Sequence, residues 1–195
     1  ADARGFPGRI ATLVLPADVA WEPAGGAAAV PAAAGPEPVD EAQVEAAATA
    51  LGGEEPAVLI LGFRTLADRA TLRLAGAIAA RTGAALMAPT ANPRTERGGG
   101  LPPVARIPYV VEQAREVLAR FRRAVLVETP EPVAFFAYPE TPSRVLPEAC
   151  AVRALARPGQ CGVAAIARLA ERLGVGEADA LVAPEERPSP PAAGA

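Results

Sequence analysis

Residues 57–61 form an unbroken apolar run, Ala-Val-Leu-Ile-Leu, between Pro56 and Gly62. A short, continuous run of this kind is typical of a parallel strand that is covered on both faces. Further strands are predicted at residues 84–88, 124–127 and 149–155. Helical patterns separate these runs, so the sequence predicts an α/β fold in which helices cover both faces of a parallel sheet.

The expected helices have recognisable ends. Asp40, with Gln43 three residues later, predicts a helix start, and Gly52 predicts its end. A second helix is expected over about residues 66–81, before Gly83. Its inner side is predicted to carry Leu66, Ala70, Leu74 and Ile78. Two later helices are predicted over about residues 110–121 and 163–173.

The two ends of the chain differ from this middle part. Residues 10–15 are apolar and end at Pro16, so they are interpreted as another buried strand. Residues 21–39 are rich in alanine, glycine and proline and are interpreted as a linker. The main domain is therefore placed at residues 40–176, with residues 177–195 as a C-terminal linker.

Composition excludes several kinds of chemistry. The sequence has no lysine and no histidine, which removes Schiff-base lysines, a P-loop lysine, and the commonest general base and metal ligand. The formal net charge of −3 argues against a nucleic-acid partner. No apolar run approaches the roughly 18 residues of a membrane span, so we expect a soluble, cytoplasmic protein. Cys150 and Cys161 lie too far apart for a Cys-x-x-Cys motif and are expected to be reduced thiols that serve packing.

Ligands of parallel sheets bind beyond the carboxyl ends of the strands, so the loops at those ends carry the candidate site. The candidate cofactor-binding residues are Gly62, Phe63, Arg64, Thr65, Thr90, Arg97, Gly98 and Glu128. The loop that follows residues 57–61 has a single glycine, Gly62, so it does not meet the Gly-x-Gly-x-x-Gly pattern of an ordinary dinucleotide site.

Each charged candidate has two interpretations. Arg64 would assist a phosphate held by backbone N–H groups, or it is a solvated side chain in a tight turn, and the second interpretation is favoured. Arg97 would bind a phosphate, or it belongs to a turn that a partner domain orders. Glu128 would accept ribose hydroxyls, or it caps a neighbouring helix or is solvated, and the second interpretation is again favoured.

Aromatic residues gather between prolines at Phe135, Phe136 and Tyr138. They would cover a flavin ring, or they are buried at a domain or subunit contact, which is the favoured interpretation. Trp21 is likewise interpreted as an interface anchor. The sequence contains no recognisable nucleophile–base pair, carboxylate dyad or metal cluster, so no catalytic residue is assigned and the chain alone is not expected to catalyse a reaction.

Several separated blocks carry a resemblance to a known family. They are residues 12–21, the glycine- and proline-rich stretch at 97–109, Pro-Val-Ala-Phe-Phe-Ala-Tyr-Pro at 132–139, and Pro158-Gly159. In this order they resemble the middle domain of thiamine-diphosphate enzymes, in the branch that is similar to acetolactate synthase large subunits. The resemblance implies a three-layer, Rossmann-like (DHS-like NAD/FAD-binding) domain with a six-stranded parallel sheet.

The resemblance also implies partners and an activity for the whole enzyme. The middle domain would lie between a pyrimidine-binding domain, whose end is residues 1–20, and a diphosphate-binding domain, in a homo-oligomer. Those neighbours would hold thiamine diphosphate and magnesium, and the enzyme would decarboxylate a 2-keto acid and transfer the acyl unit. This chain would serve as a scaffold and a possible nucleotide-binding module.

The resemblance bears on FAD as well, because the middle domain of acetolactate synthases binds this cofactor. The family's flavin-contacting Arg-Phe-Asp-Asp-Arg segment is replaced here by Glu-Thr-Pro-Glu-Pro at residues 128–132, and its Gly-Gly-Gly turn is replaced by Gly62-Phe63-Arg64. An empty nucleotide site is therefore expected, although FAD or ADP binding stays open. The alternatives are an independent module that binds FAD, ADP or a CoA, and an interaction domain without a ligand.

Overall fold

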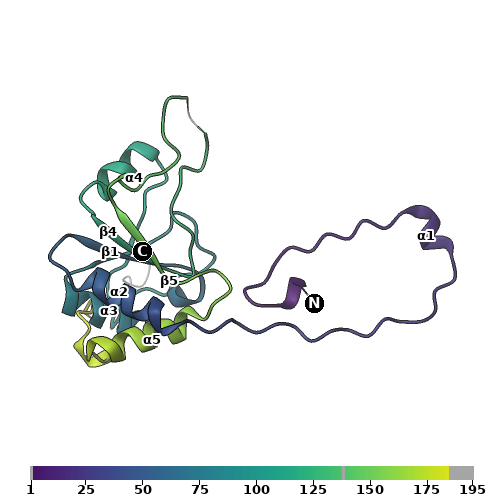
Figure 1. Ribbon diagram of the computed structural model, residues 1–195, viewed down its shortest axis with the longest axis horizontal. Helices are drawn as coiled ribbons and strands as arrows, with labels where there is room; N and C mark the ends of the chain where they lie inside the picture. The colour runs from purple at the N-terminus through teal and green to yellow at the C-terminus, as the bar shows by residue number, and fades with distance from the viewer. Residues whose placement is uncertain (1, 138, 185–195) are drawn as a thin grey trace, which may run out of the picture.

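A five-stranded parallel sheet forms the centre of the computed structural model, which describes residues 2–137 and 139–184 (Figure 1). The strands are β1 Ala57–Leu61, β2 Ala85–Ala88, β3 Ala105–Arg106, β4 Arg123–Val127 and β5 Ala151–Ala156. Their order is β3-β2-β1-β4-β5 and every neighbouring pair is parallel, which confirms the predicted α/β class. The sixth strand that the resemblance implies is not among the described residues.

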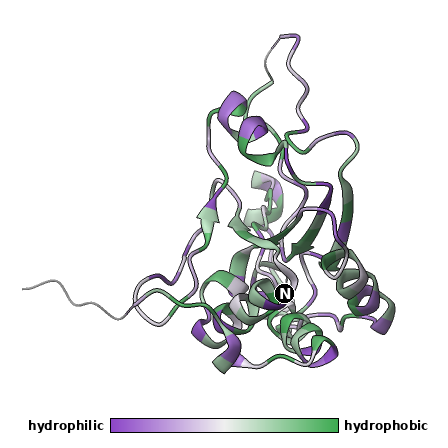
Figure 2. Ribbon diagram, turned by 90° about the vertical axis from the view of Figure 1, so that its left-hand side faces the viewer, coloured by the Kyte–Doolittle hydropathy of each residue, from purple (hydrophilic) through white to green (hydrophobic). Residues whose placement is uncertain are grey.

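Helices cover both faces of this sheet, as predicted. They are α2 Glu41–Leu51, α3 Arg69–Thr82, α4 Val111–Leu118 and α5 Gly162–Leu173. Successive residues of β1 point to opposite faces: Leu59 and Leu61 pack in the core with α2, α3 and α5, whereas Val58 and Ile60 pack in the core with α4. Figure 2 shows the hydrophobic strands between helices whose outer faces are hydrophilic.

The order of the strands places a topological switch point between β1 and β4. The chain runs outward from β1 to β2 and β3, then returns to add β4 on the other side of β1. The register aligns Leu61 with Val127, so the two strands end side by side. Connections that leave adjacent strands in opposite directions open a crevice at this position, which is where parallel sheets bind ligands.

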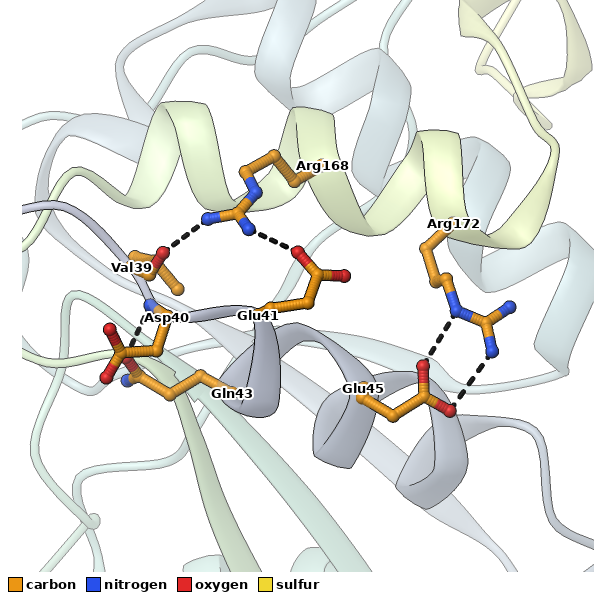
Figure 3. Close-up of polar contacts among 7 residues, drawn as sticks. All are labelled: Val39, Asp40, Glu41, Gln43, Glu45, Arg168 and Arg172. Carbon is orange, nitrogen blue, oxygen red and sulfur yellow. Dashed lines mark hydrogen bonds and ion pairs between the residues drawn. The ribbon is translucent and has the colours of Figure 1, made fainter.

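Polar contacts fix α2 against α5 (Figure 3). The predicted capping box is present: the Asp40 N–H donates to Gln43 Oε1 at 3.1 Å. Arg168 of α5 donates to the Val39 carbonyl and forms an ion pair with Glu41. Arg172, one turn later, donates to both Glu45 oxygens at 2.7 and 3.0 Å. These surface pairs contribute little energy each, and they add to the apolar packing of α2 and α5 in one core.

The second helix starts later than the sequence indicated. Residues Phe63–Leu66 form a 3-10 turn, η2, and Asp68 caps α3 by accepting the Thr71 N–H at 2.7 Å. The predicted inner side is therefore wrong at Ala70, which is exposed, whereas Leu74 is half-buried and packs against the core as predicted. The buried face of α3 carries Thr71, Leu72, Ala75, Gly76, Ala77 and Ile78. The helix ends as expected at Gly83, which is left-handed with φ of 72°.

The long loop after β2 is more ordered than the sequence suggested. It contains β3, which sequence reasoning missed, and it is closed by the C-terminal segment. The Gly100 N–H donates to the Ala183 carbonyl at 3.0 Å, and the Ala183 N–H donates to the Leu101 carbonyl at 2.9 Å. Residues 177–184, which we placed in the C-terminal linker, thus lie against the domain, with the 3-10 turn η3 Glu177–Asp179 beside α3. The rest of the expected tail, 185–195, lies outside the described residues.

The predicted strand at residues 10–15 is wrong. This segment belongs to a long N-terminal loop that extends from the body of the protein and carries η1 Asp2–Arg4 and the short helix α1 Ala17–Trp21 (Figure 1). Ile10 is 98% exposed and Leu13 is 87% exposed. An apolar run becomes a strand only beside a partner strand, and none of the described strands lies next to this one.

Truncation of the central strand should destabilise the protein strongly. Leu59 is completely buried, so Leu59→Ala should lower the free energy of unfolding by about 2–5 kcal/mol through lost burial and a cavity. The matched control is Leu13→Ala in the exposed N-terminal loop, which should change it by less than about 0.5 kcal/mol. Urea unfolding measures both, and equal losses would show that the N-terminal loop is packed.

Candidate functional site

Glu128 lies at the switch point of the sheet, directly after β4. The adjacent strand β1 is followed by Gly62, whose N–H donates to the Val127 carbonyl at 2.9 Å. The Glu128 N–H donates in turn to the Ala156 carbonyl of β5 at 2.8 Å. The ends of three strands are therefore joined at Val127 and Glu128.

The Glu128 carboxylate is bound by backbone donors from two different elements. Its Oε2 accepts the Arg64 N–H of η2 at 2.9 Å, and its Oε1 accepts the Gly162 N–H at the start of α5 at 2.7 Å. The residue is only 6% exposed. A buried carboxylate is tolerated when N–H groups bind both of its oxygens and a helix N-terminus adds its positive dipole. The capping interpretation of Glu128 is thus confirmed.

Two glycines lie in close contact with Glu128, Gly162 against its side chain and Gly62 against its backbone. A Cβ at Gly162 would lie 2.6 Å from Glu128 Cγ and 2.9 Å from Thr65 Cγ2. A Cβ at Gly62 would lie 2.8 Å from the Glu128 carbonyl oxygen and 2.8 Å from Thr129 Cβ. Thr65 is buried, and its hydroxyl donates to the Gly62 carbonyl at 2.5 Å. The crevice is therefore filled by the protein's own atoms.

Two predicted site residues of the same loop point outward. Phe63 has a left-handed backbone with φ of 50° and is partly exposed. The Arg64 guanidinium lies 4.6 Å from the centre of the Phe6 ring, in a cation–π contact with the N-terminal segment. Sequence reasoning missed this contact because nothing in the pattern of residues 1–20 indicates that they return to the end of β1.

The remaining predicted residues are held elsewhere on the carboxyl edge. The Thr90 hydroxyl donates to the Pro108 carbonyl at 3.3 Å and so joins the exits of β2 and β3. Arg97 and Gly98 line a separate, mainly apolar groove of about 490 Å³ with Leu101, Pro102 and Ala183. A role in cofactor binding for these residues stays a prediction.

The switch point does not fit the diphosphate of FAD or ADP. Such a group binds through free N–H donors at a helix N-terminus. Here the donors at Arg64 and Gly162 are already used by a carboxylate, whose negative charge repels phosphate. The alternative interpretation of Glu128, a contact with ribose hydroxyls, does not fit either, because both of its oxygens are engaged within the fold.

The cysteines fit a packing role. Cys150 and Cys161 are both free thiols, as predicted. Burial raises the pKa of Cys150, which makes its thiolate rare, although the nearby Arg144 acts in the opposite direction. Across residues 2–137 and 139–184, no group of histidine, cysteine or carboxylate side chains is suited to hold a metal ion. In the same ranges no helix has the length and apolarity needed to cross a bilayer.

An exposed aromatic patch, defined as Tyr109, Phe135 and Phe136, lies on the α4 side of the carboxyl edge. Phe135 is 69% exposed and its ring centre lies 4.9 Å from that of Phe136 and 5.7 Å from that of Tyr109. The sequence predicted an aromatic cluster of Phe135, Phe136 and Tyr138, and the last of these lies outside the described residues. Tyr109 was missed as a member of this patch, because it lies far from the two phenylalanines in the sequence.

The fold and its strand order define a Rossmann-like α/β domain. The chain is 41% identical over 185 residues to a Mycobacterium tuberculosis protein described as an acetolactate synthase large subunit, IlvX. This match covers 94% of the chain and 35% of that protein, so the chain spans about a third of its relative. The chain is homologous to part of an acetolactate synthase-like protein, and the resemblance seen in the sequence is confirmed.

A solved structure supports the fold. It is described as a thiamin diphosphate-dependent enzyme from Mycobacterium smegmatis, and it matches with a TM-score of 0.53 and 22% identity. The match covers 77% of this chain and 31% of the other. No family model matches the sequence.

Adding a methyl group at Gly162 should destabilise the protein through its clash with Glu128. Alanine usually favours a helix over glycine, yet Gly162→Ala should lower the free energy of unfolding by about 1–3 kcal/mol because of overpacking. Gly176→Ala is the matched control, since nothing lies within 4 Å of a Cβ there. Chemical denaturation of both variants measures the difference, and a stabilised Gly162→Ala protein would contradict the described packing.

Proposed function

We propose that this chain is the central, non-catalytic domain of an acetolactate synthase-like enzyme that depends on thiamine diphosphate. The observation that carries the proposal is the extent of the homology: 41% identity over nearly the whole chain, but over only 35% of the relative. The rest of the relative has room for the domains that would carry the chemistry. This domain would act as the scaffold between them.

The contents of the candidate site support a structural role. Glu128 is the buried carboxylate at the switch point, and its two oxygens are bound to N–H groups of the fold. It is therefore not placed to act as a general base. On the opposite edge of the sheet, just before β5, the Cys150 thiol is buried, and burial raises its pKa. The groups that the fold gathers at the carboxyl edge hold the domain together.

The activity proposed for the whole enzyme is decarboxylation of a 2-keto acid such as pyruvate, followed by transfer of the acyl unit to an acceptor. Thiamine diphosphate, when bound, supplies the stabilisation of the carbanion that this reaction needs. We place its site, and that of magnesium, in the pyrimidine-binding and diphosphate-binding domains of the same enzyme, which assembles as a homo-oligomer.

Exposed apolar surface supports contacts with those neighbouring domains. The aromatic patch of Tyr109, Phe135 and Phe136 lies on the surface of this chain, and aromatic residues dominate the energy of protein interfaces. The N-terminal loop adds a second apolar stretch, which includes Ile10, Leu13 and Trp21. We assign both surfaces to contacts with other domains of the same enzyme.

The whole enzyme and this chain should differ in activity. The complete coding sequence, expressed and supplied with thiamine diphosphate and magnesium, should release carbon dioxide from pyruvate. The chain of residues 1–195, under the same conditions, should release none. Turnover by this chain alone would contradict the scaffold role, and a complete protein inactive on pyruvate and other 2-keto acids would contradict the proposed activity.

The aromatic patch should stabilise the whole enzyme more than the isolated chain. Phe135→Ser should change the unfolding free energy of residues 1–195 by less than about 0.5 kcal/mol, since the side chain is mostly exposed. In the complete enzyme the same change should cost about 2 kcal/mol or more, because a buried aromatic contact is lost. Val117→Ser, at an exposed apolar residue of α4 outside the patch, is the control. Equal effects of Phe135→Ser in both proteins would argue against an interface.

A further inference from the structure

We propose that Glu128 is a built-in substitute for the phosphate of a nucleotide, and that its carboxylate closes the dinucleotide crevice of this domain. The fold would then hold its switch point together without FAD, ADP or a related ligand. This inference concerns the chain itself and does not depend on the activity proposed for the whole enzyme.

The first argument is the position of the donors. The Arg64 N–H follows β1 and the Gly162 N–H begins the 12-residue helix α5, so they come from residues almost a hundred positions apart. Both point at the space beyond the switch point, where a sheet of this type presents N–H groups to an anion. The Glu128 oxygens lie 2.9 and 2.7 Å from them, in the place of two phosphate oxygens.

The second argument is that the backbone is shaped to hold this carboxylate inside. Glu128 has φ of 53°, a left-handed conformation that is uncommon for a residue other than glycine. Such a conformation persists where the surroundings impose it. The surroundings here include Gly162, where a Cβ would lie 2.6 Å from Glu128 Cγ and 2.8 Å from Cδ. An exposed, merely solvated glutamate would not need a glycine beside its Cγ and Cδ.

The third argument concerns charge. A nucleotide phosphate at this point would have to displace the Glu128 carboxylate from both N–H groups and leave it buried beside another anion. Burial of an uncompensated carboxylate is very unfavourable. The guanidinium of Arg64, whose own N–H is one of the two donors, lies over the Phe6 ring. The geometry therefore excludes a phosphate ligand while Glu128 stays in place.

Removal of the carboxylate should convert this point into an anion site. Wild-type protein should show no change in its thermal midpoint with inorganic phosphate, ADP or FAD. Glu128→Ala should lower the midpoint by about 4–8 °C, because two buried N–H groups lose their acceptor. Inorganic phosphate should recover part of this loss in Glu128→Ala only. Glu54→Ala, at an exposed glutamate in the turn after α2, is the matched control and should behave as the wild type does.

A second variant separates the charge from the space. Glu128→Gln keeps the size of the side chain, so it should lower the midpoint but leave no room for phosphate and show no recovery. If Glu128→Ala does not fold, Glu128→Gln still allows the proposal to be tested. Absorbance of FAD retained by the wild-type protein, or a midpoint raised by ADP or FAD in the wild type and not in Glu128→Gln, would overturn the proposal. So would a folded, destabilised Glu128→Ala protein that phosphate leaves unchanged.

Discussion

Burial of β1 on both faces is the constraint on which the rest of the structure depends. All five of its residues are buried, and they divide between two cores, one with α2, α3 and α5 and the other with α4. A strand of this kind needs a neighbour on each side and a layer above and below. Because β2 and β4 flank it, their connections leave in opposite directions and create the switch point where Glu128 lies.

Local chemistry made much of this arrangement predictable. Apolar residues identified four of the five strands, in continuous runs for β1, β2 and most of β4, and the capping box at Asp40 and the left-handed Gly83 identified helix ends. The failures occurred where tertiary context decides. The apolar residues 10–15 look like a strand but have no partner beside them in the described chain. The two residues of β3 are too few to produce a pattern, and Asp68 moves the start of α3 beyond the point where apolar periodicity alone would place it.

The candidate site was predictable in its members but not in its connections. Gly62, Arg64 and Glu128 were identified because they follow apolar runs, and the capping role was the favoured one for Glu128. The sequence does not reveal that Gly162 is the partner of Glu128, because the two residues lie 34 positions apart. Its importance comes from the absence of a Cβ in a crowded place, a property that appears only when the fold brings the two segments together.

The two faces of the sheet are covered unequally, and this has a consequence for motion. Three helices cover one face, and the ion pairs of Arg168 and Arg172 join two of them, α2 and α5. The other face is covered by the eight-residue α4 and by irregular chain around Val145 and Cys150. Short helices and irregular segments open locally at lower free-energy cost than well-connected layers. Amide protons on the α4 side will therefore exchange with solvent sooner than those on the opposite face.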